Sequence, residues 1–193
     1  MINYSDEEIF EKISYAKKNQ EAYFFKKFIS EDALPNWKDF LNCIYEVQKQ
    51  DRSYQFTNNN NMPEETIGNL LITEKIHFAP QAIEYFDYFN LINKDIKILN
   101  EIFKINFGFG GPKVCLGNFI VGLHFDKWDA INIQCEGKTI WNVSDNNFKE
   151  TYEMERGDLL FFPEGMKHSV ESSTARANLV FNYPNILENI DLF

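Results

Sequence analysis

Three residues in the second half of the chain have the types and spacing to bind one metal ion together. His124 and Asp126 form a His-x-Asp motif, and His168 follows later in the chain. Because successive residues of an extended strand alternate between its two faces, His124 and Asp126 would point to the same side. Two imidazoles and one carboxylate can occupy one face of an octahedral ion and leave three positions open, a donor set that suits Fe(II). His168 must then come from a strand that lies nearby in space.

The His-x-Asp motif alone also fits a solvated turn with an ordinary His and Asp, because so short a motif arises by chance. The segment that ends at His168 favours the metal site. Its residues Gly157, Pro163, Gly165 and His168 have the spacing of the second sequence motif of cupin barrels. Residues 129–141 resemble the strand-turn-strand that follows His-x-Asp in cupin-like and Jumonji C oxygenases, where a Gln, a Gly and then a Trp recur. The resemblance covers roughly residues 106–183.

The resemblance implies a fold and an activity. The expected fold is α+β, a double-stranded β-helix (cupin or jelly-roll) barrel with an N-terminal helical layer. We expect a single domain over residues 1–193, mainly helical over 1–105, with the barrel core over 106–193. The implied activity is that of an Fe(II)- and 2-oxoglutarate-dependent oxygenase, a hydroxylase that also consumes dioxygen. The implied substrate is a side chain of a peptide or protein, with an amino-acid-like small molecule left open.

In such oxygenases the far carboxylate of 2-oxoglutarate needs a cationic anchor, since an unpaired buried carboxylate is costly. Many Jumonji-like members have a Lys or Arg at the strand position where this chain has Thr139. We expect Arg176, on a later strand, to replace it, and Thr139 to add a hydroxyl donor. A surface salt bridge is the alternative for Arg176. Asn132 and Gln134 share one strand face and could bind cosubstrate or substrate, or satisfy backbone groups of the barrel.

Two other functions fit parts of the pattern. A metal-dependent cupin enzyme that does not use 2-oxoglutarate, such as a dioxygenase or isomerase, would explain Thr139 at the anchor position. A non-catalytic cupin-like binding module would have no need of the intact set of His124, Asp126 and His168. The remaining histidine, His77, has no acidic partner two residues on, so we expect it to be structural.

Composition limits the class of partner. Of the 193 residues, 44% are hydrophobic and 16% aromatic, which is enough apolar material for a folded core. The net charge of −10 argues against a nucleic-acid partner, because phosphate backbones are bound by clustered Lys and Arg. No apolar run approaches the roughly 18 residues that span a bilayer, so no membrane partner is expected.

The cysteines and the N-terminus predict the compartment. The three cysteines, Cys43, Cys115 and Cys135, form no close pair, and the first residues are polar and acidic. Reduced, mostly buried thiols in a cytoplasmic protein are the simplest interpretation. The oligomeric state is left open, with a homodimer among the options.

The sequence pattern places helices before strands. Ser5 and Glu8 can form a capping box that starts a helix, Glu21–Ile29 predicts a strand, and Ser30 starts a second helix. An irregular loop is expected over 51–63. Further helices are predicted over 63–73, 80–92 and 93–105. Strands are predicted near 113–123, 129–136, 138–143, 150–154, 158–162, 167–172 and 176–183. Helices first and strands later favour an α+β layout.

Overall fold

The computed structural model of the protein describes residues 2–49, 56–57, 76–78, 109–144 and 149–183. Its helical elements are α1 (Asp6–Asn19), the short 3-10 helix η1 (Glu31–Ala33) and α2 (Trp37–Lys49). Its strands are β1 (Tyr23–Phe25), β2 (Phe56–Thr57), β3 (Ile76–Phe78), β4 (Phe109–Leu116), β5 (Phe119–Phe125), β6 (Asp129–Glu136), β7 (Thr139–Ser144), β8 (Lys149–Met154), β9 (Leu159–Phe162), β10 (Lys167–Ser172) and β11 (Arg176–Tyr183). The helices predicted over 63–73, 80–92 and 93–105 lie outside the described residues.

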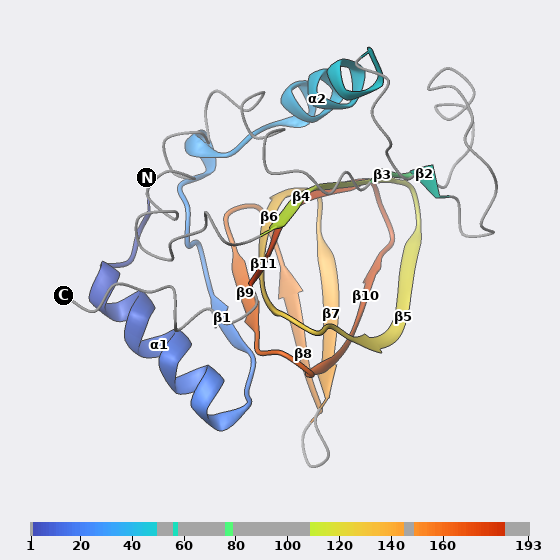
Figure 1. Ribbon diagram of the computed structural model, residues 1–193. Helices are drawn as coiled ribbons and strands as arrows, with labels where there is room; N and C mark the ends of the chain where they lie inside the picture. Colours follow the sequence, from blue (N-terminus) through green and yellow to red (C-terminus); the bar gives the residue numbers. More distant parts are fainter. Residues whose placement is uncertain (1, 50–55, 58–75, 79–108, 145–148, 184–193) are drawn as a thin grey trace.

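These strands form two antiparallel sheets. The larger has seven strands in the order β1-β9-β6-β11-β4-β3-β2, and the smaller has four in the order β5-β10-β7-β8. The sheets face each other around a central space, and α1 and α2 lie outside the larger one (Figure 1). Two facing antiparallel sheets with few helices are the architecture of jelly-roll folds.

The alternation of side chains along β6 separates two cores. Ile131 and Ile133 face the helices and belong to a cluster with Ile9 and Phe40. Ala130, one residue away, faces the smaller sheet. That second cluster also contains Leu160 and Phe162 of the larger sheet, and Trp141, Val143 and Val170 of the smaller one. The larger sheet therefore packs on both faces, and polar residues at inward positions of β6 are enclosed between the sheets.

The predicted capping box at the start of α1 is confirmed. The Glu8 amide donates to the Ser5 hydroxyl at 3.2 Å, and the Ser5 amide donates to the Glu8 carboxylate at 2.9 Å. The helix ends at Gln20, whose φ of 56° is in the left-handed region. Ile9 and Ile13 are fully buried, so this apolar stripe attaches α1 to the larger sheet.

The next two elements are shorter or later than predicted. The strand predicted over Glu21–Ile29 is formed only by β1, because the chain turns at Lys27, which has a positive φ of 52°. The helix predicted from Ser30 is only the single turn η1, which ends before Pro35. The helix proper is α2, where the Asn36 side chain accepts a bond from the Lys38 amide at 2.9 Å. Asn36 therefore supplies the cap that we expected from Ser30.

The strands of the second half match their predicted ranges closely, with one exception. The strand predicted over 113–123 is two strands, β4 and β5, separated by a bend at Gly117. The two strands belong to different sheets. This division matters for the site, because it places Lys113 in the larger sheet and His124 in the smaller one.

The N-terminal part supplies strands as well as helices to the fold. Within the loop predicted over 51–63, Phe56 and Thr57 form β2, and the other loop positions lie outside the described residues. His77 lies in β3, opposite Cys115 of β4. The first half of the chain thus extends the larger sheet at both ends, through β1 on one side and β2 and β3 on the other.

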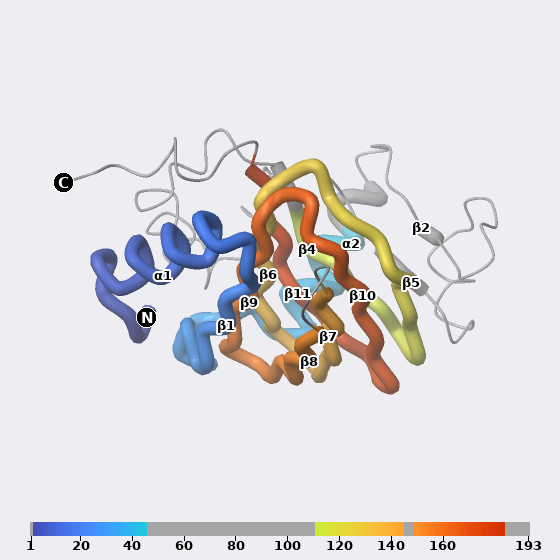
Figure 2. The backbone as a smooth tube through the Cα atoms, turned by 90° about the horizontal axis from the view of Figure 1, so that it is seen from below, coloured from blue at the N-terminus to red at the C-terminus, as the bar shows by residue number. Residues whose placement is uncertain are grey.

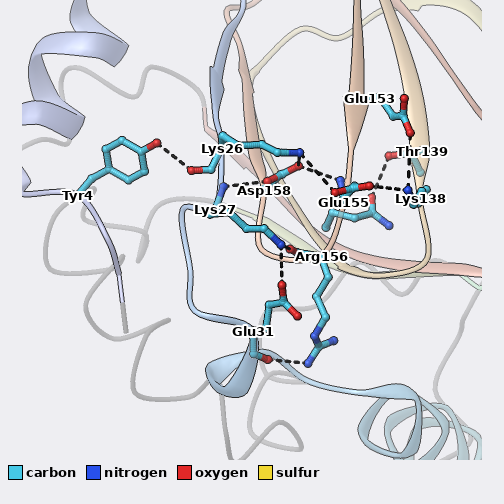
Figure 3. Close-up of polar contacts among 11 residues, drawn as sticks. Tyr4, Lys26, Lys27, Glu31, Lys138, Thr139, Glu153, Glu155, Arg156 and Asp158 are labelled. Atoms are coloured by element: carbon cyan, nitrogen blue, oxygen red, sulfur yellow. Dashed lines mark hydrogen bonds and ion pairs between the residues drawn. The ribbon is translucent and has the colours of Figure 1, made fainter.

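Ion pairs and hydrogen bonds hold η1 and the segment that follows β1 against the turn between β8 and β9 (Figure 3). Asp158, which is fully buried, accepts bonds from the Lys27 amide at 2.8 Å, the Lys26 ammonium at 3.0 Å and the Glu155 amide at 2.9 Å. The Arg156 guanidinium donates to the Glu31 carbonyl oxygen at 2.8 Å. Because these donors come from both sides of the contact, the carboxylate of Asp158 is compensated where water is excluded.

We predict that Gly137→Ala destabilises the protein more than Gly165→Ala. Both glycines have a positive φ, of 68° and 80° respectively. A methyl group at Gly137 would collide with the Ala175 carbonyl oxygen, whereas nothing lies within 4 Å of one at Gly165. Strain alone costs about 1–2 kcal/mol, and the overlap adds about 1–3 kcal/mol. Equal losses in urea-unfolding free energy would show that the β6–β7 turn does not clash with Ala175.

The cysteines are buried free thiols, as predicted for Cys43, Cys115 and Cys135. Burial raises the pKa of the Cys43 thiol to about 12, so it stays protonated at neutral pH. Within the part of the chain that the structure describes, no helix has both the length and the apolar character needed to cross a membrane.

Candidate metal centre

The three predicted ligands come together at one end of the smaller sheet. His124 of β5 and His168 of β10 are directly opposite in the antiparallel ladder, and the two strands run side by side (Figure 2). Asp126 follows the last residue of β5. One ligand atom from each of the three side chains lies within 4.8 Å of the others, and His168 Nε2 is 3.6 Å from Asp126 Oδ2. The three donors therefore surround a space of the size that one metal ion requires.

Both imidazole rings are held by backbone carbonyl groups. His124 Nδ1 is 2.8 Å from the Gly122 oxygen, and His168 Nδ1 is 2.9 Å from the Met166 oxygen. A carbonyl oxygen can only accept, so each Nδ1 carries the proton and each Nε2 keeps its lone pair. A hydrogen bond of this kind commonly fixes the ring and tautomer of a metal-ligating histidine.

The surroundings of His168 favour its neutral form. The ring stacks on Phe162, with centroids 4.7 Å apart and planes inclined by 3°, and Trp141 lies 5.9 Å away. The residue is 4% exposed. Burial lowers the pKa of His168, and the neighbouring His124 lowers it further. A neutral imidazole is the form that binds metal ions.

The loops that carry the ligands are bonded to each other. The Gly165 amide donates to the Asp126 carbonyl oxygen at 2.9 Å, and the Glu164 amide donates to Asp129 Oδ1 at 2.9 Å. Asp129 is fully buried, and Lys17 of α1 forms an ion pair with it. These contacts hold the loop before β10 against the loop after β5, so Asp126 and His168 keep their relative positions.

A pocket of about 260 Å³ extends from the ligands into the space between the sheets. Pockets that bind drug-sized ligands have volumes of roughly 300–1,000 Å³, so this slightly smaller pocket suits a small metabolite. The residues that line it are Lys113, Val121, His124, Asp126, Ala130, Asn132, Trp141, His168, Val170, Arg176, Asn178, Val180 and Asn182. The pocket thus contains the three ligands together with Asn132 and Arg176, two of the four residues expected to bind a cosubstrate.

Arg176 lies in this pocket and not on the surface. It is 3% exposed, and its guanidinium lies 5.2 Å from the ring of Phe119. One Nη donates to Asn178, and Nε has no hydrogen-bond partner. Burial lowers the pKa of Arg176 to about 10, which still leaves it charged at neutral pH. Since no carboxylate in the described residues pairs with it, Arg176 is a buried cation that lacks an anion.

Thr139 and Gln134 do not line this pocket in the described part of the chain, so their expected contact with a cosubstrate stays a prediction. The Thr139 hydroxyl donates to Gln134 Oε1 at 2.9 Å and accepts from Trp141 Nε1 at 3.0 Å. Gln134 in turn donates to the Glu136 carbonyl oxygen at 2.7 Å. Their polar groups satisfy one another. This arrangement favours the alternative role, in which Gln134 satisfies groups within the barrel.

Two polar residues of the pocket, Lys113 and Asn182, were not predicted from the sequence. Asn178 and Asn182 lie two and six residues after Arg176 along β11, on the same strand face, so strand parity could have found Asn182. Lys113 lies opposite Asn178 in the ladder between β4 and β11. Because one continuous strand was predicted over 113–123, the sequence did not show that Lys113 lies in the larger sheet, beside β11.

No protein-family model and no curated protein matches the chain. Solved structures of Escherichia coli YcfD are similar to it, at 16–19% sequence identity. One has a TM-score of 0.64 and covers 97% of this chain and 55% of YcfD. Another, of YcfD described as a ribosomal oxygenase in complex with cobalt and 2-oxoglutarate, has a TM-score of 0.60 and covers 88% and 50% respectively. The chain therefore spans about half the length of YcfD, and the resemblance to cupin-like oxygenases predicted from the motifs is confirmed for the fold.

Proposed function

We propose that the protein is an Fe(II)- and 2-oxoglutarate-dependent oxygenase on a double-stranded β-helix barrel. One observation carries the proposal: a single pocket holds two histidines, one carboxylate and a buried guanidinium that pairs with no anion in the described residues. The first three are the donor set of non-haem iron oxygenases. The fourth is what the far carboxylate of 2-oxoglutarate requires. The YcfD ribosomal oxygenase, whose fold this chain shares, was crystallised with cobalt and 2-oxoglutarate, which supports the same assignment.

Five of the pocket residues have a part in this proposal. His124, Asp126 and His168 would hold the metal through Nε2, a carboxylate oxygen and Nε2. Arg176 would bind the far carboxylate of 2-oxoglutarate, because its planar fork matches that group. Asn132 would donate a hydrogen bond to cosubstrate or substrate. Together with dioxygen, the bound iron and 2-oxoglutarate would supply the oxidation of a C–H bond, with succinate and carbon dioxide as coproducts.

We propose a side chain of a peptide or protein, or an amino-acid-like small molecule, as the substrate. The substrate's C–H bond must reach the metal through this pocket, whose lining includes the partly exposed Asp126 and Asn182. Nucleic acid is a poor candidate for a chain with a net charge of −10.

The second candidate is a metal-dependent cupin enzyme that does not use 2-oxoglutarate. The observation that favours it is Thr139, which stands where many related oxygenases have a cation and is bonded to Gln134 and Trp141. The buried charge of Arg176 weighs against it, since a pocket without an anionic ligand would leave that charge uncompensated.

We predict that the protein converts 2-oxoglutarate to succinate slowly even without its true substrate. The measurement is succinate formation in air with Fe(II) and ascorbate, with a metal-free sample as the control. Succinate above the control level would support the oxygenase. Absence of both succinate and 2-oxoglutarate binding would support the second candidate instead.

A further inference from the structure

Lys113 places a second positive charge in the pocket of Arg176. It lies on β4, opposite Asn178, which in turn bonds to the Arg176 guanidinium. The Lys113 side chain lines the pocket together with Arg176 and the three metal ligands. Besides the two histidines, the pocket lining therefore has two cationic side chains, Lys113 and Arg176, and one carboxylate, Asp126, in a chain whose net charge is −10. The pocket therefore has an excess of positive charge, whereas the chain as a whole is negatively charged.

The charge of Lys113 is compensated only in part by protein groups in the described residues, through the Asp126 carboxylate. No hydrogen bond or ion pair to its ammonium occurs there, although it feels the charges of both Arg176 and Asp126. Burial lowers the pKa of Lys113, and the nearby Arg176 lowers it further. Two like charges kept together in a partly dehydrated pocket repel each other. An anion that contacts both would offset the repulsion and satisfy the free donors.

We propose that Lys113 is a second contact for the far carboxylate of 2-oxoglutarate, so that Lys113 and Arg176 hold it from two strands of the larger sheet. The inference rests on the proposed function. It gives Lys113 the ionic role that Thr139 cannot perform at the usual position. A carboxylate has two oxygens, each with more than one acceptor site, so it can bind an ammonium and a guanidinium at once.

The test compares two ligands that differ only in the far carboxylate. The protein is loaded with Mn(II) without iron, so that no turnover occurs, and is titrated calorimetrically with 2-oxoglutarate or 2-oxopentanoate. The variant Lys113→Met removes the charge and keeps the length of the side chain. We expect it to weaken 2-oxoglutarate binding roughly 10- to 150-fold, the range for one hydrogen bond to a charged group, and to leave 2-oxopentanoate binding unchanged. Lys149→Met, an exposed position on β8, is the matched control and should alter neither affinity.

The outcomes separate this inference from the function on which it rests. Equal 2-oxoglutarate affinity in the wild type and Lys113→Met would overturn the role of Lys113 and leave the oxygenase proposal standing. An equal loss for both ligands would also overturn it, since a distorted pocket would affect both. If the wild type binds Mn(II) but shows no preference for 2-oxoglutarate over 2-oxopentanoate, the proposed function itself is overturned.

Discussion

Replacing His124, Asp126 or His168 with alanine should abolish high-affinity binding of a divalent metal and all turnover. Each variant removes a donor from a set whose atoms lie within 4.8 Å of one another. Loss of a residue that only orients a ligand typically costs about 10–100-fold in metal affinity, so loss of a ligand should cost more than about 100-fold. Calorimetric titration with Fe(II) in the absence of oxygen, or with Mn(II), measures the effect.

The matched control for this series is Glu171→Ala. Glu171 lies on β10 with His168, but it is exposed on the outer face of the smaller sheet. Its loss should leave metal affinity unchanged. The circular dichroism spectra of the ligand variants should match that of the wild type, because the ladder between β5 and β10 does not depend on these side chains. Retention of full metal affinity by both His124→Ala and Asp126→Ala would place the metal site elsewhere.

The second large effect is expected at Arg176. Arg176→Ala should weaken 2-oxoglutarate binding while metal affinity is retained, because the guanidinium lines the same pocket as the ligands and is none of them. Loss of a charge-assisted pair costs on the order of 2–5 kcal/mol when the partner charge stays buried. At about 1.4 kcal/mol per tenfold, this corresponds to roughly 30-fold to several-thousand-fold weaker affinity.

Arg176→Lys tests whether geometry matters as well as charge. A lysine keeps the positive charge but lacks the planar fork, so it should recover only part of the lost affinity. The affinity for 2-oxoglutarate, measured with Mn(II) bound, gives the answer for both variants. An alanine variant that binds 2-oxoglutarate as tightly as the wild type would show that the anchor lies at another residue.

The strands of the second half could be predicted because their signals are local. β10 and β11 have the predicted bounds, since each is a short segment between turn residues whose polar and apolar side chains follow the strand pattern. Local signals also predicted that Asn132 faces the pocket, through the alternation along β6. They could not show that Gln134, on the same face, is already bonded to Thr139, because that contact depends on how the β6–β7 hairpin closes.

What could not be predicted depends on contacts between distant parts of the chain. The two residues of β2 and the three of β3 are too short to give a pattern. They are strands because β3 pairs with the edge of β4 and β2 pairs with β3. Ser30 was expected to cap the second helix, but Asn36 does so, because the chain forms only the single turn η1 before Pro35. Lys113 was overlooked for a similar reason, since its neighbours in space, Asn178 and Arg176, lie on a strand far along the chain.

The position of β5 has a consequence for how the protein unfolds. β5 ends the four-stranded sheet and pairs there with β10, through a ladder that is irregular between His168 and Val170. A cation held by His124 and His168 would tie these two strands together where they face each other. In the unfolded chain the same donors are far apart, so the ion would bind the folded form in preference. By mass action, a free concentration one hundred times Kd adds about 2.7 kcal/mol to the free energy of unfolding. The ion would then stabilise the edge strand β5 against detachment from the sheet, and the melting temperature would rise with the concentration of free metal.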